Sequence, residues 1–463
     1  MSSTHREAGP PTTNQEHTAH NRAGSPSIFP ILGWSARVIQ TEWSRRTRLL
    51  FLAASLTAAL LASATAAGAE QTVGAVSVAA PSAPEQRVVA YGSSQLLLIR
   101  PVYAEHPGIT RINVDGTVDR TFGEEGTVEI ASEDAAVSRD GKILVSTSSH
   151  PASAGANADA RVTRLLPDGQ PDPSFGAGGS TDVDFGGRYD NGQAVALAAN
   201  GEILLGGYRL RHAVGRGEGN LHPAVARLRP DGSLDRSFAR KGVRVLAGGG
   251  EITVLDIAPT PDRGVVLQIG NEIEAELLKL TRKGSVDTDF GERGWVEVRG
   301  RRERYGYHEE LFLAPQLAVL SSGKLLLAAT GSPNRGPNDW SRVVAVRLRP
   351  DGRIDRSYGD EGWAATSKGH GHDLAEGLAL LPGGVLAVAT TFTRPPNERR
   401  DFGVIAFGPD GRLERQFGEQ GRCRAPLAGK QEALGVVALG RRAAVLGYGG
   451  AHQWLLNCPA VRL

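Results

Sequence analysis

Short apolar runs separated by turn residues recur along most of this chain. In the third repeat, four such runs cover residues 193–198, 202–206, 224–228 and 243–246, and we call them strands a to d. Asn200-Gly201 stands between the first two runs and is a strong signal for a tight hairpin turn. Strand b is almost continuously apolar in each repeat, which is typical of a strand covered on both faces. The pattern predicts repeated sheets of four short antiparallel strands.

Strand c leads into a motif that is clearest at residues 349–362, RPDGRIDRSYGDEG. Its Asp-Gly pair predicts a tight turn, because glycine adopts positive φ and aspartate caps its own backbone. A second acid follows three residues after this glycine, and turn formation explains the repeated acids better than calcium binding does. An aromatic residue follows three further on, and we expect it to pack one repeat against the next. The turn glycines, 52 to 68 residues apart, are Gly116, Gly169, Gly232, Gly284, Gly352 and Gly411.

The number of repeats predicts a closed ring. Seven segments have the pattern of strand b, but the motif occurs six times, and the chain ends where the last strand d should begin. Residues 73–78 (VGAVSV) alternate like a strand d and precede the first strand a. We expect them to complete the last sheet, beside a strand c at residues 459–463. Closure would cover the edges that an open sheet must protect.

The fold predicted is therefore all-β: a seven-bladed β-propeller of four-stranded antiparallel blades, whose last blade is closed by the N-terminal strand. A β-solenoid is the main alternative, but its coils are usually shorter and no capping segments are found. The closed ring would bring Cys423, in strand d of the sixth repeat, near Cys458 in the last. The two cysteines are either a disulfide that holds the closure or two buried free thiols, and an oxidising location favours the disulfide.

Composition agrees with many turns and short strands, since the chain has 59 Gly and 26 Pro in 463 residues. One core of this length would be unusually large, so repetition explains how the chain is organised.

The N-terminal part has the pattern of an exported protein. Residues 1–43 are polar and irregular and predict a disordered extension. Arg45, Arg46 and Arg48 then precede an apolar run that ends in small residues, which predicts a signal peptide at 44–69 with cleavage after Ala69. A retained membrane anchor is the alternative reading. With cleavage, we expect no stable membrane insertion, a secreted or cell-surface location, and residues 70–463 as the propeller.

The predicted mature chain is close to neutral. Residues 1–69 contain six Arg and three Glu, so their removal from a chain of net charge +2 leaves about −1. Binding of nucleic acid requires a basic face, so we expect no nucleic-acid partner. No sequence feature indicates an oligomer, and we expect a monomer.

The repeat resembles a known family. The pattern PDGxxDxSFGxxG, followed by an apolar segment such as residues 140–145 (DGKILV), is similar to the delta-60 repeat of secreted bacterial proteins. The resemblance covers residues 87–463, with departures at Ala239, Lys283 and Glu414. It implies a propeller-like module outside the cytoplasm, and it implies no common chemistry.

Candidate binding residues lie in the connections from b to c and from d to a, which vary most in length, as binding loops on rigid scaffolds do. One group could ligate calcium or zinc, although a polar surface loop is the simpler interpretation. A second group could grip an acidic glycan or form a solvated charged loop. The first group is His308, Glu309, His370, His372, Asp373 and Glu376, and the second is Arg301 and Arg302.

No nucleophile elbow, phosphate loop or zinc-protease helix is present in the sequence. We therefore expect an exported scaffold that binds a glycan, a peptide or a surface protein, with no required cofactor. The alternative is an exported hydrolase or lyase acting on polysaccharide, with its carboxylates near the channel.

Overall fold

The computed structural model describes residues 75–78, 87–149, 157–210, 221–247, 252–271, 275–300, 310–332, 341–366, 372–394, 399–425, 427, 429–449 and 452–461. The expected disordered extension and signal peptide lie outside these residues. Among the described residues, no helix is long and apolar enough to span a membrane.

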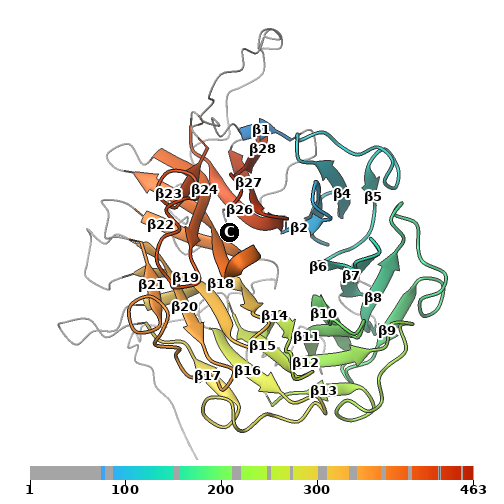
Figure 1. Ribbon diagram of the computed structural model, residues 1–463. Coiled ribbons are helices and arrows are strands. Elements are labelled where there is room, and N and C mark those ends of the chain that lie inside the picture. Colours follow the sequence, from blue (N-terminus) through green and yellow to red (C-terminus); the bar gives the residue numbers. More distant parts are fainter. Residues whose placement is uncertain are drawn as a thin grey trace, which may run out of the picture. The chain divides into compact units, whose positions relative to one another are not determined.

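The described residues form seven antiparallel sheets of four strands each (Figure 1). The first blade contains β2 (Arg87–Tyr91), β3 (Gln95–Arg100), β4 (Gly108–Asn113) and β5 (Thr127–Val128). The second contains β6 (Asp134–Val137), β7 (Ile143–Ser148), β8 (Ala160–Leu165) and β9 (Ser180–Val183). The third contains β10 (Tyr189–Leu197), β11 (Ile203–Leu210), β12 (Leu221–Leu228) and β13 (Val243–Val245). The fourth contains β14 (Thr253–Pro259), β15 (Val265–Gly270), β16 (Ala275–Leu280) and β17 (Trp295–Glu297).

The fifth blade contains β18 (Glu310–Val319), β19 (Leu325–Ser332), β20 (Arg342–Leu348) and β21 (Trp363–Ala365). The sixth contains β22 (His372–Leu381), β23 (Val385–Arg394), β24 (Arg399–Phe407) and β25 (Arg422–Arg424), with a short 3-10 turn at Pro382–Gly384. The seventh contains β26 (Glu432–Leu439), β27 (Arg442–Gly449), β28 (His452–Asn457) and β1 (Ala75–Ser77). The predicted seven-bladed propeller is confirmed.

The ring is closed by the N-terminal strand, as predicted. The first strand of each blade contacts the first strand of the next, and β26 of the last blade contacts β2 of the first. β1 is the fourth strand of the seventh blade, and Ala75 lies opposite Leu456 of β28. The expected partner of the closing strand, residues 459–463, was wrong. The third strand of the seventh blade is β28, which ends at Asn457. Pro459 has no N–H to donate to a neighbouring strand, so residues 459–463 are poorly suited to this place. In β28, by contrast, the side chains of Leu455 and Leu456 are fully buried.

The repeated motif joins the blades through an arginine of the third strand. Arg227 donates from Nε to Asp235 Oδ2 at 2.8 Å, and its guanidinium carbon lies 4.8 Å from the centre of the Phe238 ring. From Nη1 it donates to the carbonyl of Arg282 in the next blade at 2.8 Å. The second acid of the motif therefore anchors this arginine. The equivalent pairs are Arg111 with Asp119, Arg164 with Asp172, and Arg347 with Asp355.

The aromatic residues of the motif pack between blades, which confirms the prediction. Phe238, for example, shares a core cluster with Ala194 and Leu204 of its own blade and with Ile257 and Leu267 of the next. The residues at this position are at most 1% exposed: Phe122, Phe175, Phe238, Phe290, Tyr358 and Phe417.

The motif turns also hydrogen-bond from blade to blade. The amide of Gly176 donates to the carbonyl of Asp231 in the next turn at 2.9 Å. Gly232 has φ +89°, and a Cβ on it would lie 2.9 Å from Gly176 N. Glycine is required at this position by its backbone angle and by the close approach of the neighbouring turn.

Cys423 and Cys458 form a disulfide, with their Cα atoms 5.9 Å apart. Cys423 belongs to β25 of the sixth blade, and Cys458 follows β28 of the seventh. The disulfide, which was favoured over two free thiols, is thus confirmed, and it crosses the junction between these two blades.

Candidate functional site

The two faces of the ring differ in their connections. Because neighbouring strands run in opposite directions, the a–b and c–d connections leave one face and the b–c and d–a connections leave the other. The c–d connections are nearly uniform, as at 229–242 and 281–294, and we call this side the uniform face. The b–c connections range from residues 450–451 in the seventh blade to 149–159 in the second. We call that side the uneven face.

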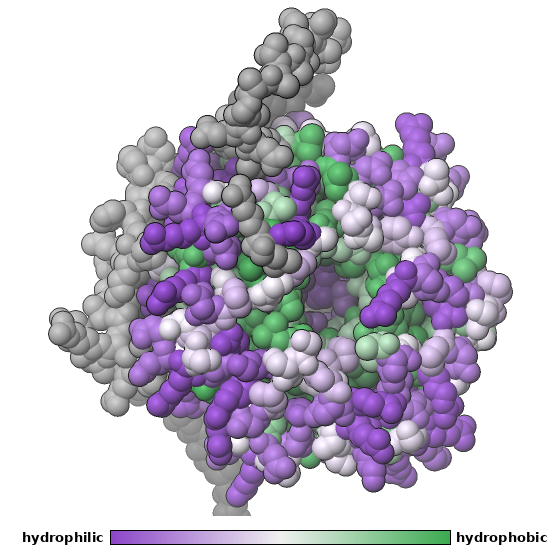
Figure 2. Space-filling model, in the orientation of Figure 1, coloured by the Kyte–Doolittle hydropathy of each residue, from purple (hydrophilic) through white to green (hydrophobic). Residues whose placement is uncertain are grey.

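The first strands of the blades surround the centre of the ring, where Figure 2 shows a hollow with hydrophilic atoms at its bottom. Three side chains of these strands accept a hydrogen bond from a main-chain amide of the next blade. The pairs are Asp134 Oδ2 with Val195 N at 3.0 Å, Asp256 Oδ2 with Leu317 N at 2.7 Å, and Gln316 Oε1 with Leu378 N at 2.9 Å. These polar groups therefore hold neighbouring blades together.

Arg87 is a positive charge among the central acids. Its Nη1 lies 3.4 Å from Asp134 Oδ1. Burial alone lowers the pKa of Arg87, but the charges of Asp134, Asp256 and Glu133 outweigh burial and raise it. Burial also raises the pKa of Asp134, and it raises the pKa of Asp256 to about 7. Arg87 opposes both acid shifts by stabilising the carboxylates.

A group of polar side chains gathers towards the uneven face at the junction of the sixth and seventh blades. We call it the Tyr448 cluster, and its members are Glu376, Thr391, Arg400, Glu432 and Tyr448. Tyr448 donates its hydroxyl to Glu432 Oε2 at 2.7 Å, and Arg400 Nη1 donates to Glu432 Oε1. Thr391 donates to Glu376 Oε1 at 3.2 Å. The Glu432 and Arg400 side chains are 23% and 30% exposed, so the cluster is accessible from outside.

The two carboxyl groups of this cluster have different surroundings. Burial, and then the charge of Glu432, raise the pKa of Glu376 to about 7, against the opposing effects of Thr391 and Arg400. Glu376 can therefore donate a hydrogen bond near pH 7. Both oxygens of Glu432 are already bonded to Arg400 and Tyr448, which leaves this carboxylate poorly placed to act as a base or nucleophile.

The predicted site residues do not all converge. His372 is exposed at the start of β22, whereas Asp373, the next residue, is buried and donates its amide to the carbonyl of Ser341 at 3.1 Å. Glu376 follows His372 by four residues on the same strand, which corresponds to about 13 Å in an extended chain. His308, Glu309, His370, Arg301 and Arg302 lie outside the described residues.

Sequence reasoning did not single out Arg87, Asp256, Arg400 or Tyr448. A signal existed for Asp256, because Asp134, Asp256 and Gln316 share one position when the repeats are aligned on the hairpin turn between strands a and b. Arg400 and Tyr448 stand near strand ends whose neighbours come from other blades, and no spacing in the sequence indicates that they meet.

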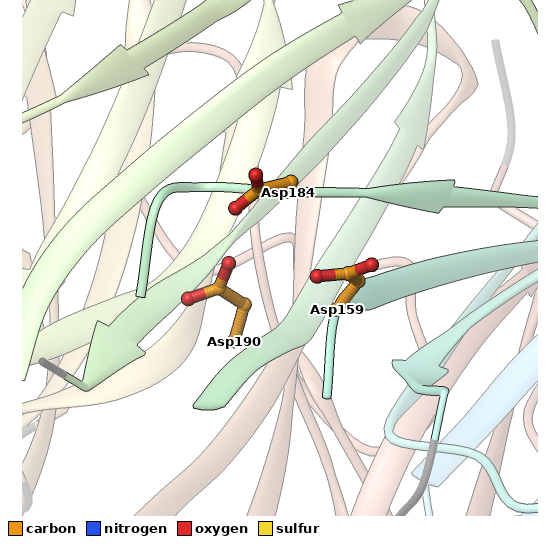
Figure 3. A group of neighbouring side chains, drawn as sticks. All are labelled: Asp159, Asp184 and Asp190. Atoms are coloured by element: carbon orange, nitrogen blue, oxygen red, sulfur yellow. The ribbon is translucent and has the colours of Figure 1, made fainter. Parts of the chain in front are cut away.

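Three carboxylates at the junction of the second and third blades are the group best suited to a metal among the described residues. Asp159, Asp184 and Asp190 each offer an oxygen, and these oxygens lie within 4.8 Å of one another (Figure 3). Such an oxygen set suits a hard cation and lacks the nitrogen or sulfur that zinc prefers. Burial raises the pKa of Asp190 to about 7, so a proton at Asp190 relieves the same repulsion that a cation would. We assign no metal to this group.

Known structures resemble the fold at low sequence identity. Puromycin hydrolase is 16% identical with a TM-score of 0.46, over 81% of this chain and 52% of that one. This chain thus spans about half of that enzyme. A polysaccharide lyase of family PL25, an ulvan lyase, is 10% identical with a TM-score of 0.40, over 81% and 84% of the two chains. Drosophila semaphorin 1b, extracellular domains 1–2, is 8% identical with a TM-score of 0.42, over 83% and 87%.

These similarities concern the propeller fold alone. No curated protein matches the chain in sequence. Two segments, residues 139–175 and 198–238, match the family model described as a domain of unknown function (DUF5122) beta-propeller.

Proposed function

We propose that this protein is an exported scaffold built from delta-60-type repeats, which binds a glycan, a peptide or a surface protein on its uneven face without chemical turnover. One observation carries the proposal: the central acids Asp134 and Asp256 accept main-chain amides of neighbouring blades, and Glu432 is saturated by Arg400 and Tyr448. Carboxylates that are committed in this way are poor catalytic bases. They are well suited to hold a rigid surface, which lowers the entropic cost of binding.

Binding by the full chain to an array of neutral oligosaccharides, acidic oligosaccharides and peptides tests this function. Arg400→Ala removes a cation from the uneven face, and Arg353→Ala removes an exposed one from the uniform face. We expect a ligand whose binding weakens with Arg400→Ala and is unchanged with Arg353→Ala, in proteins of equal melting temperature. Equal binding by the two variants would contradict the use of the uneven face.

A polysaccharide hydrolase or lyase is the second candidate, favoured by the raised pKa of Glu376 beside Glu432. A carboxyl group that holds its proton near pH 7 is what a general acid requires. Incubation of the full chain with polysaccharides, followed by measurement of released reducing ends, separates the candidates. Fragment release that is lost in Glu376→Gln would replace the binding scaffold with the enzyme.

Export is tested separately by the N-terminal mass of the protein recovered outside the cytoplasm. We expect it to begin at Glu70, as cleavage after Ala69 requires.

A further inference from the structure

The Tyr448 cluster has a counterpart at the junction of the second and third blades. Tyr208 lies opposite Asn191 across β10 and β11, as Tyr448 lies opposite Glu432 across β26 and β27. Asn191 Nδ2 donates to Glu133 Oε1 of the preceding blade at 3.3 Å. We call Glu133, Asn191 and Tyr208 the Tyr208 cluster.

Glu133 and Glu376, the glutamates contributed by the preceding blade of each cluster, also occupy one position of the repeat. Glu133 immediately precedes Asp134, which pairs with Ser146, and Glu376 immediately precedes Gly377, which pairs with Ala389. Counted from the a–b hairpin, Asp134 and Gly377 are equivalent. Each cluster therefore combines a glutamate of one blade with an amide or carboxylate and a tyrosine of the next.

The propeller itself does not require these polar groups. At the junction of the fourth and fifth blades the same three positions hold Leu255, Leu313 and Ala329. At the junction of the third and fourth blades they hold Gln193, Thr253 and Gly270, without an aromatic residue. Apolar side chains satisfy the same geometry, so blade packing does not account for two clusters that each contain a glutamate and a tyrosine.

The chemistry of the clusters suits a sugar. A tyrosine offers an apolar ring and a hydroxyl, and Tyr189 adds a second ring whose centre lies 6.4 Å from that of Tyr208. Carboxylate and amide oxygens accept hydrogen bonds from sugar hydroxyls, and amide nitrogens donate hydrogen bonds to them. The clusters hold three carboxyl groups, Glu133, Glu376 and Glu432, against one cation, Arg400, so they offer no surplus of positive charge to an acidic sugar. Both tyrosines are partly exposed, and both stand on second strands close to their ends at the uneven face.

We infer that the Tyr208 and Tyr448 clusters are two equivalent subsites for an uncharged glycan on the uneven face. The inference rests on the proposed binding function and names its ligand class. The clusters lie on different sides of the ring centre, at β10–β11 and at β26–β27 (Figure 1). An oligosaccharide long enough to reach across the ring would contact both.

Calorimetric titration of the full chain with cellohexaose, maltohexaose, xylohexaose and mannohexaose, and with hexagalacturonate as the acidic comparison, tests the inference. Tyr208→Phe and Tyr448→Phe each remove one hydroxyl while the ring remains. We expect each to weaken binding of a neutral hexasaccharide about three- to tenfold, as loss of one hydrogen bond does, and the double variant to show the product. The matched control is Tyr91→Phe, which removes a hydroxyl bonded to the Gly141 carbonyl at the a–b turns of the uniform face.

Three results would overturn the inference: no binding of any neutral hexasaccharide, tighter binding of hexagalacturonate, or unchanged affinity in the double variant. A peptide ligand that depends on Arg400, together with no glycan binding, would end this inference and leave the proposed scaffold intact. Absence of any ligand on the array would end both. Equal melting temperatures of the Phe variants and the unsubstituted protein show that folding is unaffected.

Discussion

The guanidinium carbon of Arg347 lies 4.6 Å from the centre of the Tyr358 ring, and both side chains are buried. Arg347 also donates from Nε to Asp355 Oδ2 at 2.7 Å and from Nη1 to the carbonyl of Pro409 in the next blade at 2.6 Å. One side chain thus links the turn of its own motif, the aromatic wedge and the neighbouring blade.

Arg347→Ala should lower the free energy of unfolding by about 3 kcal/mol, because it leaves the buried Asp355 with Lys324 as its remaining cation. Urea denaturation measures the loss. Arg353→Ala, on the same turn but exposed, should stay within about 0.5 kcal/mol of the unsubstituted protein. A loss below about 1 kcal/mol for Arg347→Ala would mean that the repeated arginine is dispensable.

Cys458→Ser should lower the free energy of unfolding by about 2–4 kcal/mol, because the disulfide restricts the unfolded chain and joins the sixth blade to the seventh. Melting curves with and without a reducing agent measure the effect. The reductant should lower the melting temperature of the unsubstituted protein and leave that of Cys458→Ser unchanged. A reductant effect of equal size in both proteins would assign it to something other than this bond.

The central charges predict a dependence on pH. Since the folded pKa of Asp256 is raised to about 7, Asp256 keeps in the folded state a proton that the unfolded state has lost between about pH 4 and 7, and the raised pKa of Asp134 acts in the same direction. Their contribution to stability therefore falls as pH rises through this window. Arg87 offsets this loss once Asp134, Asp256 and Glu133 are ionised. Arg87→Met should cost more stability at pH 8 than at pH 5, measured by urea denaturation at both; equal costs would contradict the assignment.

Closure of the ring by β1 predicts a local effect of proline. Val78 N donates to the carbonyl of Gln453 at 3.0 Å, and the Val78 side chain is buried. Val78→Pro removes this donor and should cost about 3 kcal/mol, with association of the exposed β28 edge visible by size-exclusion chromatography. Ser77→Ala, at an exposed neighbouring position of β1, should melt and elute like the unsubstituted protein. Val78→Pro with an unchanged melting temperature would show that β1 does not hold the ring closed.

The repeat count, the strand order and the closing strand could be predicted because they depend on local signals. Asn200-Gly201 and the repeated Asp-Gly turns specify hairpins through backbone angles, and these need no distant partner. The partner of β1 was misplaced because residues 459–463 resemble a strand c ending, and the decisive feature, burial of Leu455 and Leu456 in the seventh blade, comes from packing. A short apolar run does not reveal which of two neighbours it will pair with.

The candidate site was less predictable for a related reason. His372 and Asp373 attracted notice because they are adjacent in sequence, and a strand sends adjacent side chains to opposite sides. Glu376, Arg400 and Glu432 lie close together but come from three different strands in two blades. Contacts of this kind arise where blades meet, so they follow from the ring and not from any spacing along the chain.

By itself, the sequence determined that this protein is a ring of repeated four-stranded sheets, because turn residues and apolar periodicity act over a few residues at a time. Only the tertiary structure decided which acids hold the blades together and which polar groups remain exposed at the uneven face. The reason is physical: the pKa and the hydrogen-bond partners of a carboxyl group depend on burial and on neighbours within a few ångströms, and in this ring those neighbours belong to other blades.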